Sequence, residues 1–164
     1  MGDVHQPLHA ASYFSTQFPN GDRGGNLWNV SGFNWTTELH ALWDGGLGQW
    51  YGDLNRPLNA SGVQWVEDLS SKVISLYPVA SMEPYIKEYN ASTWANESFA
   101  IAENFCYTAP PSSPNPNPIP DAYLAEGREI VLKQIAIAGY RLADLLQFIF
   151  TSPADSQYTR IVLP

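Results

Sequence analysis

The sequence predicts an all-α fold from two observations. Long segments repeat apolar residues at the three- and four-residue spacing of a helix, whereas strand-like alternation is weak and confined to residues 26–30. The 164 residues include 45% hydrophobic and 15% charged side chains, which is typical of one soluble domain with a sizeable core. We therefore expect residues 1–164 to form a single helical domain.

Short helical segments are expected near the N-terminus. Pro7 suits the first position of a helix, where its missing N–H costs nothing, and His9 would then project from the start of that helix. Residues 38–44, ELHALWD, are expected to form another helix. Three longer helices follow from apolar periodicity: Val63–Leu76, which Pro78 would end, Trp94–Phe105 and Tyr123–Phe150.

The last of these helices carries the longest apolar stripe, which we expect to pack on the core. Lys133, Arg141 and Asp144 are expected among its polar positions. The stripe comprises Leu124, Ile130, Val131, Ile135, Ala138, Leu142, Leu145, Leu146 and Ile149.

One segment, 109–120, has a distinct composition. It reads APPSSPNPNPIP, with six prolines in twelve residues. Because proline removes a backbone donor and disfavours helix at the residue before it, we expect an extended surface loop that connects two helices.

The overall composition excludes several classes of protein. Sixteen acidic against eight basic residues give a formal charge of -8. This charge argues against a protein that binds nucleic acid through basic side chains, but not against one in which bound metal ions supply the positive field. No apolar stretch reaches the roughly 18 to 20 residues that span a membrane. The single cysteine, Cys106, excludes an internal disulfide and a cysteine-based metal site, so any metal would be held by histidine and carboxylate.

All three histidines lie in the first quarter of the chain. His40 and Asp44 are four residues apart and would share one face of a helix, to which His9 could be brought from another helix. Two imidazoles and a carboxylate with an open fourth position are typical of a catalytic zinc site. Taken alone, such a helical pair more often forms a salt-bridged histidine, and we interpret His5 as a buried, hydrogen-bonded histidine.

Three motifs occur in order along the chain: GDVHQPLH at 2–9, GDRGGN at 21–26 and ELHALWD at 38–44. Together they closely resemble the C-terminal portion of the class I single-strand-specific nucleases, extracellular zinc enzymes of the P-one and S-one type. Two later segments, WANES at 94–98 and AGYRLA at 138–143, resemble later helices of that family, so the resemblance covers nearly the whole chain. It implies the helical fold shared with zinc-dependent phospholipases C.

The resemblance also implies a role for each site residue. Asp3 matches an aspartate that bridges two of the family's three zinc ions, and is the residue to which we assign a catalytic role. His9, His40 and Asp44 match the ligands of the remaining zinc ion, and Trp43 is expected to pack behind the site. The implied reaction is attack of a metal-bound hydroxide on a phosphodiester of single-stranded DNA or RNA, with 3′-nucleotidase as an additional activity.

The resemblance is to the C-terminal part of these enzymes, and their N-terminal helices and remaining zinc ligands have no counterpart in this sequence. We therefore expect at most one full zinc site here, formed by His9, His40 and Asp44. The isolated chain is expected to be poorly stable and to have little nuclease activity, whereas a full-length parent would be active. Cys106 is either one half of a disulfide to the missing part or a buried small hydrophobic residue.

Five N-x-S/T sequons favour a secreted or lysosome-like location for the parent protein, as a glycoprotein. Their asparagines are Asn29, Asn34, Asn59, Asn90 and Asn96. The first residues, MGDVHQPLHAAS, lack the apolar core of a signal peptide. We infer no membrane and no obligatory protein partner, and we expect a monomer.

Other interpretations stay open. A zinc-dependent phospholipase C would share the metals and the fold, and a non-catalytic secreted remnant would keep one metal site, but the spacing of HQPLH and LHxxWD favours the nuclease. The aromatic residues Tyr13, Phe14 and Phe18 either pack on the core, which we favour, or stack on bases.

Overall fold

The computed structural model of the chain describes residues 1–50, 56–109 and 118–151. Within these ranges the predicted all-α fold is confirmed, because every named element is a helix. The stretch 26–30 contributes an isolated bridge between Asn29 and Glu38, and a second such bridge joins Ser31 to Pro118. The elements are three 3-10 helices, η1 (Asp3–His5), η2 (Pro7–Ala10) and η3 (Cys106–Thr108), and five α-helices, α1 (Leu39–Asp44), α2 (Ala60–Leu76), α3 (Val79–Ile86), α4 (Ala91–Asn104) and α5 (Asp121–Thr151).

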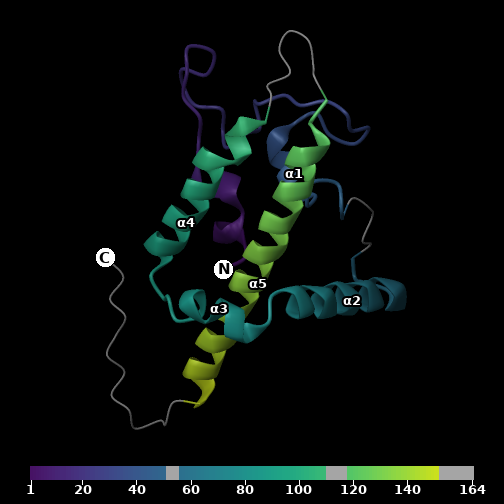
Figure 1. The fold of residues 1–164 in the computed structure, drawn as a ribbon, viewed down its shortest axis with the longest axis vertical. Coiled ribbons are helices and arrows are strands. Elements are labelled where there is room, and N and C mark those ends of the chain that lie inside the picture. The colour runs from purple at the N-terminus through teal and green to yellow at the C-terminus, as the bar shows by residue number, and fades with distance from the viewer. Residues whose placement is uncertain (51–55, 110–117, 152–164) are drawn as a thin grey trace.

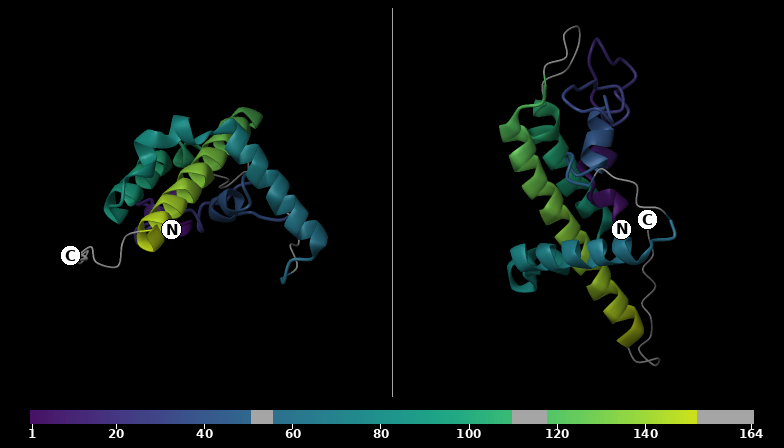
Figure 2. Two further views of the ribbon diagram at one scale, coloured as in Figure 1. Left: turned by 90° about the horizontal axis from the view of Figure 1, so that it is seen from below. Right: turned by 90° about the vertical axis from the view of Figure 1, so that its right-hand side faces the viewer.

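Helix α5 is the longest element, and α2, α3 and η1 all contact it (Figure 1). The N-terminal segment, with η1 and η2, lies between α4 and α5 and packs along α4. Helices α2 and α3 pack against α5, and α2 projects to one side of the molecule (Figure 2). The two long helices α4 and α5 therefore hold between them the segment that carries two of the three histidines.

Side-chain caps set where two helices begin. Asn59 accepts a hydrogen bond from the N–H of Gly62, so α2 starts three residues earlier than apolar periodicity predicts. Asn90 accepts one from the N–H of Ser92, which likewise starts α4 before the predicted first residue. Both caps are polar and precede the apolar pattern, which is why periodicity placed each start too late.

Proline explains one correct and one missed boundary. Helix α2 ends at Leu76, two residues before Pro78, as predicted. Helix α3, directly after it, was not predicted because it contains Pro84, a residue that ordinarily argues against a helix interior.

The main core lies where α1 meets the start of α5. Leu39 and Leu42 are fully buried, and Trp43 is 2% exposed. The Trp43 indole N–H donates to the Tyr123 hydroxyl at 2.9 Å, and that hydroxyl donates to the carbonyl of Cys106 at 2.8 Å. Trp43 thus packs behind the site, as expected, and a chain of two hydrogen bonds ties it to α5 and η3.

Cys106 lies in this core as a fully buried free thiol. Burial raises its pKa well above the ordinary value, so the thiol stays protonated. Within this chain Cys106 therefore behaves as a small hydrophobic residue, and its pairing with a second chain segment stays a prediction.

The predicted apolar stripe of α5 is wrong in part. Val131 is buried as expected, but Ile135, Leu142 and Ile149 are 41–47% exposed, whereas Arg141, expected at a polar position, is 1% exposed. Leu132, Ala136 and Ile137 are buried instead. Helix α5 is apolar on more than one face, so periodicity predicts the helix without deciding which face packs.

Helix α2 shows the same effect. Val73 is 5% exposed, but Val66 and Leu76, which share its predicted face, are 39% and 49% exposed. Because α2 projects from the molecule and packs mainly against α5, one narrow strip of it is buried.

The proline-rich segment 109–120 is described only at its ends, and its residues 110–117 lie outside the described ranges. Ala109 and Ile119 are 1% and 6% exposed and belong to the core, so both ends of the segment are anchored. In the described parts of the chain, no helix combines the length and apolar character needed to cross a membrane.

Candidate metal centre

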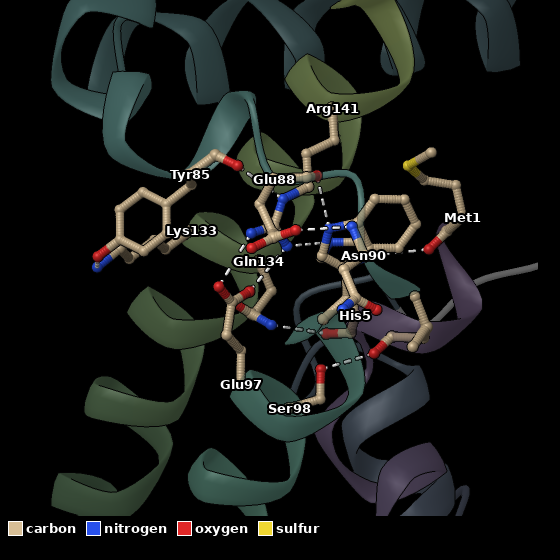
Figure 3. A network of polar contacts seen from close by, with 12 residues as sticks. Met1, His5, Tyr85, Glu88, Asn90, Glu97, Ser98, Lys133, Gln134 and Arg141 are labelled. Carbon is tan, nitrogen blue, oxygen red and sulfur yellow. Dashed lines mark hydrogen bonds and ion pairs between the residues drawn. The ribbon is translucent and has the colours of Figure 1, made fainter. Parts of the chain in front are cut away.

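Polar contacts fix the N-terminal segment to α4 and α5 (Figure 3). The Ser98 hydroxyl of α4 donates to the carbonyl of Val4 at 2.6 Å, and the Gln134 amide of α5 donates to the carbonyl of His5 at 3.1 Å. Arg141 donates from Nη1 to Nε2 of His5 at 2.8 Å. Backbone and side chain of the segment are therefore both held.

Arg141 connects three helices through its guanidinium group. Its two Nη atoms bind the two carboxylate oxygens of Glu97 on α4 at 2.8 and 3.0 Å, and its Nε–H donates to the carbonyl of Tyr85 on α3 at 2.9 Å. The Trp94 ring lies 5.5 Å from the guanidinium carbon. A buried cation that is paired and hydrogen-bonded in this way is a rigid support for whatever it holds.

His5 is the buried, hydrogen-bonded histidine that the sequence predicts, with 3% of its surface exposed. Because Arg141 can only donate, Nε2 of His5 accepts, and Nδ1 carries the proton donated to the carbonyl of Met1 at 2.9 Å. Burial lowers the pKa of His5, and the positive charge of Arg141 lowers it further. His5 is therefore a neutral structural residue that holds the segment in place.

The structure brings together three of the four predicted site residues. His9 of η2 and His40 and Asp44 of α1 each offer a ligand atom, all within 4.8 Å of one another. Nε2 of His9 lies 3.6 Å from Oδ1 of Asp44, and Nε2 of His40 lies 3.5 Å from Oδ2 of Asp44. The two imidazole rings stack, with centroids 4.9 Å apart.

Contacts on the far side of each ring turn both Nε2 atoms toward Asp44. Nδ1 of His40 donates to the carbonyl of Gly24 at 2.7 Å, and Nδ1 of His9 lies 3.0 Å from Oδ1 of Asp3. In a neutral imidazole with Nδ1 protonated, Nε2 is left as a lone-pair donor. Such outer contacts are the usual means by which proteins orient metal-binding histidines.

Asp3 takes a different place from the other three. Its side chain is 89% exposed, and its carboxylate meets Nδ1 of His9, on the side of the ring away from Asp44. Among the residues that the structure describes, His9, His40 and Asp44 form the one group of three potential ligands. The bridging role expected for Asp3 requires ligands that this group does not contain.

The glycine loop beside the cluster is shaped by close backbone contacts. Gly24 and Gly25 have φ values of 65° and 86°, and a Cβ on Gly24 would lie 2.4 Å from the carbonyl oxygen of Leu8. Arg23 also has a positive φ, 59°, and its carbonyl accepts a hydrogen bond from the Asn26 side chain at 2.7 Å. The carbonyl of Gly24 accepts the hydrogen bond from His40, and this contact carries no sequence signal because any residue has a carbonyl.

A cavity of about 520 Å³ opens beside the cluster. Asp3, His9 and Asp44 line its polar end, and Trp50, Val131 and Leu142 contribute to its apolar wall. The candidate site is therefore accessible from an apolar groove along α5.

The aromatic residues after His9 divide between the two expectations. Tyr13 packs edge-on against Trp28, with centroids 5.2 Å apart, and Phe18 packs on the core. Phe14 is 67% exposed. Core packing is thus confirmed for Phe18, whereas Tyr13 contacts the core residue Trp28 but is 41% exposed.

Sequence reasoning missed Gln6, although it lies within the first motif. Its side-chain Nε2 donates to Oδ1 of Asp44 at 2.9 Å, linking η2 to α1 across the cluster. Glutamine is a common surface residue, so only its place between two histidines in HQPLH could have marked it.

Helices and a cluster of two imidazoles and a carboxylate define this molecule as an all-α protein with a candidate divalent metal centre. The chain belongs to the S1/P1 nuclease family, whose model matches residues 1–151. It is 30% identical to Endonuclease 3 of Arabidopsis thaliana over 156 residues, which cover 93% of this chain and 49% of that protein. It is also 30% identical to Endonuclease 4 of Arabidopsis thaliana over 164 residues, which cover 93% of this chain and 48% of that protein. The chain therefore spans about half the length of the curated relatives it matches.

Proposed function

We propose that His9, His40 and Asp44 bind a zinc ion in a protein that hydrolyses phosphodiester bonds in single-stranded nucleic acid. One observation carries the proposal: both Nε2 atoms face the Asp44 carboxylate, in a chain of the S1/P1 nuclease family. Two imidazole nitrogens and a carboxylate oxygen are a donor set that suits zinc and leaves a fourth position open. The residues present therefore fit the metal on which the family generally depends.

When bound, zinc would polarise a phosphoryl oxygen and make a water molecule more acidic. The chain's own part is to fix the ligands. Asp3 contacts the His9 ring and the Gly24 carbonyl contacts the His40 ring, so that both Nε2 atoms face Asp44. The groove beside them would admit the phosphate of a substrate. Because the Asp3 side chain is 89% exposed, it is accessible to further metal ions whose other ligands lie outside this group.

The acidic chain limits the substrate to one recognised at the metal. A net charge of -8 repels a polyanion at long range, so zinc must supply the local attraction for phosphate. A single strand bends its backbone toward a metal at one end of a groove at lower cost than a duplex, which favours single-stranded DNA or RNA and extends to the 3′-phosphate of a nucleotide. We propose that the protein acts as a monomer.

We also propose that the parent protein is a glycoprotein with a secreted or lysosome-like location. The five sequon asparagines, Asn29, Asn34, Asn59, Asn90 and Asn96, are all exposed. Asn59 and Asn90 also cap helices, and their exposed side chains stand at the starts of α2 and α4. A mobility shift on enzymatic deglycosylation of protein from eukaryotic cells, absent from the Asn→Gln variants, tests this proposal.

The function is tested with the full-length gene product and its Asp44→Asn variant, on single-stranded DNA, duplex DNA, RNA and phosphatidylcholine. We expect the protein to cleave single strands, chelation to abolish this cleavage and added zinc to restore it. The Asp44→Asn variant should cleave more slowly by on the order of 100-fold or more. If phosphatidylcholine is hydrolysed in preference to nucleic acid, the protein is a phospholipase C and the proposed nuclease function is wrong. Unaltered cleavage after chelation, or by Asp44→Asn, would overturn the zinc mechanism.

A further inference from the structure

Gln6 uses both ends of its side-chain amide within the candidate metal centre. Oε1 accepts a hydrogen bond from the backbone N–H of Leu8 at 2.5 Å, and Nε2 donates to Oδ1 of Asp44 at 2.9 Å. Its backbone carbonyl accepts from the N–H of His9 at 3.0 Å. One residue thus contacts the start of η2, the backbone of one histidine ligand and the carboxylate ligand.

The chemistry of these contacts fixes which way the amide points. A backbone N–H can only donate, so the side-chain atom that faces Leu8 is the oxygen. The remaining atom, which faces Asp44, is then the NH₂ group, a donor matched to an ionised carboxylate. Capping of η2 therefore determines the orientation of the donor at Asp44.

Asp44 needs such an orienting contact because packing does not hold its side chain. Its side chain is 51% exposed at the last residue of α1. Oδ1 lies 3.6 Å from Nε2 of His9 and Oδ2 lies 3.5 Å from Nε2 of His40, so each oxygen faces one imidazole. The two oxygens are distinguished by Gln6, whose Nε2 donates to Oδ1 and so occupies one of its lone pairs.

We propose that Gln6 is a positioning residue that holds Asp44 so that Oδ2 alone binds the metal. This inference rests on the proposed function, since it requires the His9, His40 and Asp44 site to take a metal. Gln6 matches the task because glutamate of the same length could accept from Leu8 but could not donate to Asp44. Outer contacts of this kind typically change metal affinity by about 10- to 100-fold.

The test measures binding of Zn²⁺ and the visible absorption of bound Co²⁺ in the chain and three variants. Gln6→Met removes the donor and the cap, and Gln6→Glu keeps an acceptor for Leu8 but loses the donor. Gln49→Met is the matched control, because Gln49 donates to the carbonyl of Gly46 at 3.2 Å, in the turn that follows Asp44.

We expect Gln6→Met to bind Zn²⁺ about 10-fold more weakly than the unaltered chain. Both Gln6 variants should change the Co²⁺ spectrum, which reports the number and arrangement of ligands, because Asp44 can then bind through both oxygens. Gln49→Met should match the unaltered chain in affinity and spectrum. If Gln6→Met does not fold, Gln6→Glu, which retains the cap, carries the spectral test.

A Gln6→Glu spectrum identical to that of the unaltered chain would show that Gln6 is only a helix cap and would overturn the inference. Equal Zn²⁺ affinity of a folded Gln6→Met would do the same, and in both cases the metal site itself would stand. Absence of metal binding by the unaltered chain would overturn the site and the positioning role together.

Discussion

Arg141 and Glu97 form a two-point ion pair between α5 and α4, with nitrogen to oxygen distances of 2.8 and 3.0 Å. Each residue belongs to one of the two later motifs, AGYRLA and WANES. The pair joins these distant motifs directly, and the same guanidinium group binds His5 in the first motif. Three of the sequence motifs on which the family resemblance rests therefore meet at one buried arginine.

Replacing Arg141 should destabilise the chain strongly. Arg141→Met leaves Glu97 without its partner and removes a donor from His5, and breaking one side of a buried pair costs about 3 kcal/mol or more. Because the Glu97 side chain is 32% exposed, water offsets part of this cost and we expect about 2–3 kcal/mol. Urea denaturation of both proteins measures the difference.

Lys72→Met on the exposed surface of α2 is the control for Arg141→Met, and should change the free energy of unfolding by less than about 0.5 kcal/mol. Equal stability of Arg141→Met and Lys72→Met would contradict the role assigned to the ion pair.

Tyr123→Phe should destabilise the chain by about 1–3 kcal/mol, because it leaves the Trp43 indole N–H and the Cys106 carbonyl without the hydroxyl that joins them. Tyr89→Phe removes a hydroxyl that binds Asp144 at an exposed position, and should cost much less. Thermal unfolding followed by circular dichroism compares the two, and a larger loss for Tyr89→Phe would argue against the buried relay.

Gly24→Ala should disrupt the site that Gly139→Ala leaves intact. Gly24 has a positive φ and lies against the Leu8 carbonyl, so an added Cβ is strained there by about 2 kcal/mol or more. Gly139 is a helical residue with no atom within 4 Å of an added Cβ, and alanine there should stabilise α5 by up to about 1 kcal/mol. Because the Gly24 carbonyl orients His40, metal binding should weaken in Gly24→Ala alone. Isothermal titration with Zn²⁺ checks this, and unchanged affinity in Gly24→Ala would contradict the role of the loop.

The sequence predicts the helices better than their packing. Local signals such as Pro78 and the apolar spacing of α2, α4 and α5 are contained in adjacent residues, so they can be interpreted without a structure. The buried face of α5 cannot be predicted in this way, because the helix is apolar on several sides and only its neighbours decide which side is covered. Arg141 illustrates the difficulty, because a charged residue in a helix is expected on the solvent-exposed side. Its burial depends on Glu97 and His5, which are far away in the sequence.

The candidate site divides in the same way. His40 and Asp44 follow from helical spacing, and the motifs add His9 to them. Gln6 and the Gly24 carbonyl could not be predicted, because each acts through a tertiary contact to a ligand and neither residue type signals that role. The exposure of Asp3 likewise depends on which segments surround it.

The 164-residue chain on its own should cleave single-stranded DNA weakly or not at all. Its described residues gather one group of three ligands, whereas the family resemblance implies three zinc ions and a bridging role for Asp3. Initial rates on single-stranded DNA with zinc present, compared with those of the full-length gene product, test this. Comparable rates for the two proteins would contradict the need for further ligands.

The decisive measurement for the His9, His40 and Asp44 site is the zinc content of the purified chain. After zinc loading and dialysis, elemental analysis should find about one zinc ion per chain, and the His40→Ala variant should lose it, whereas Lys72→Met, on the exposed surface of α2, should retain it. A chain that holds no zinc, or a His40→Ala variant that holds as much as the unaltered chain, would show that these residues do not form a zinc site.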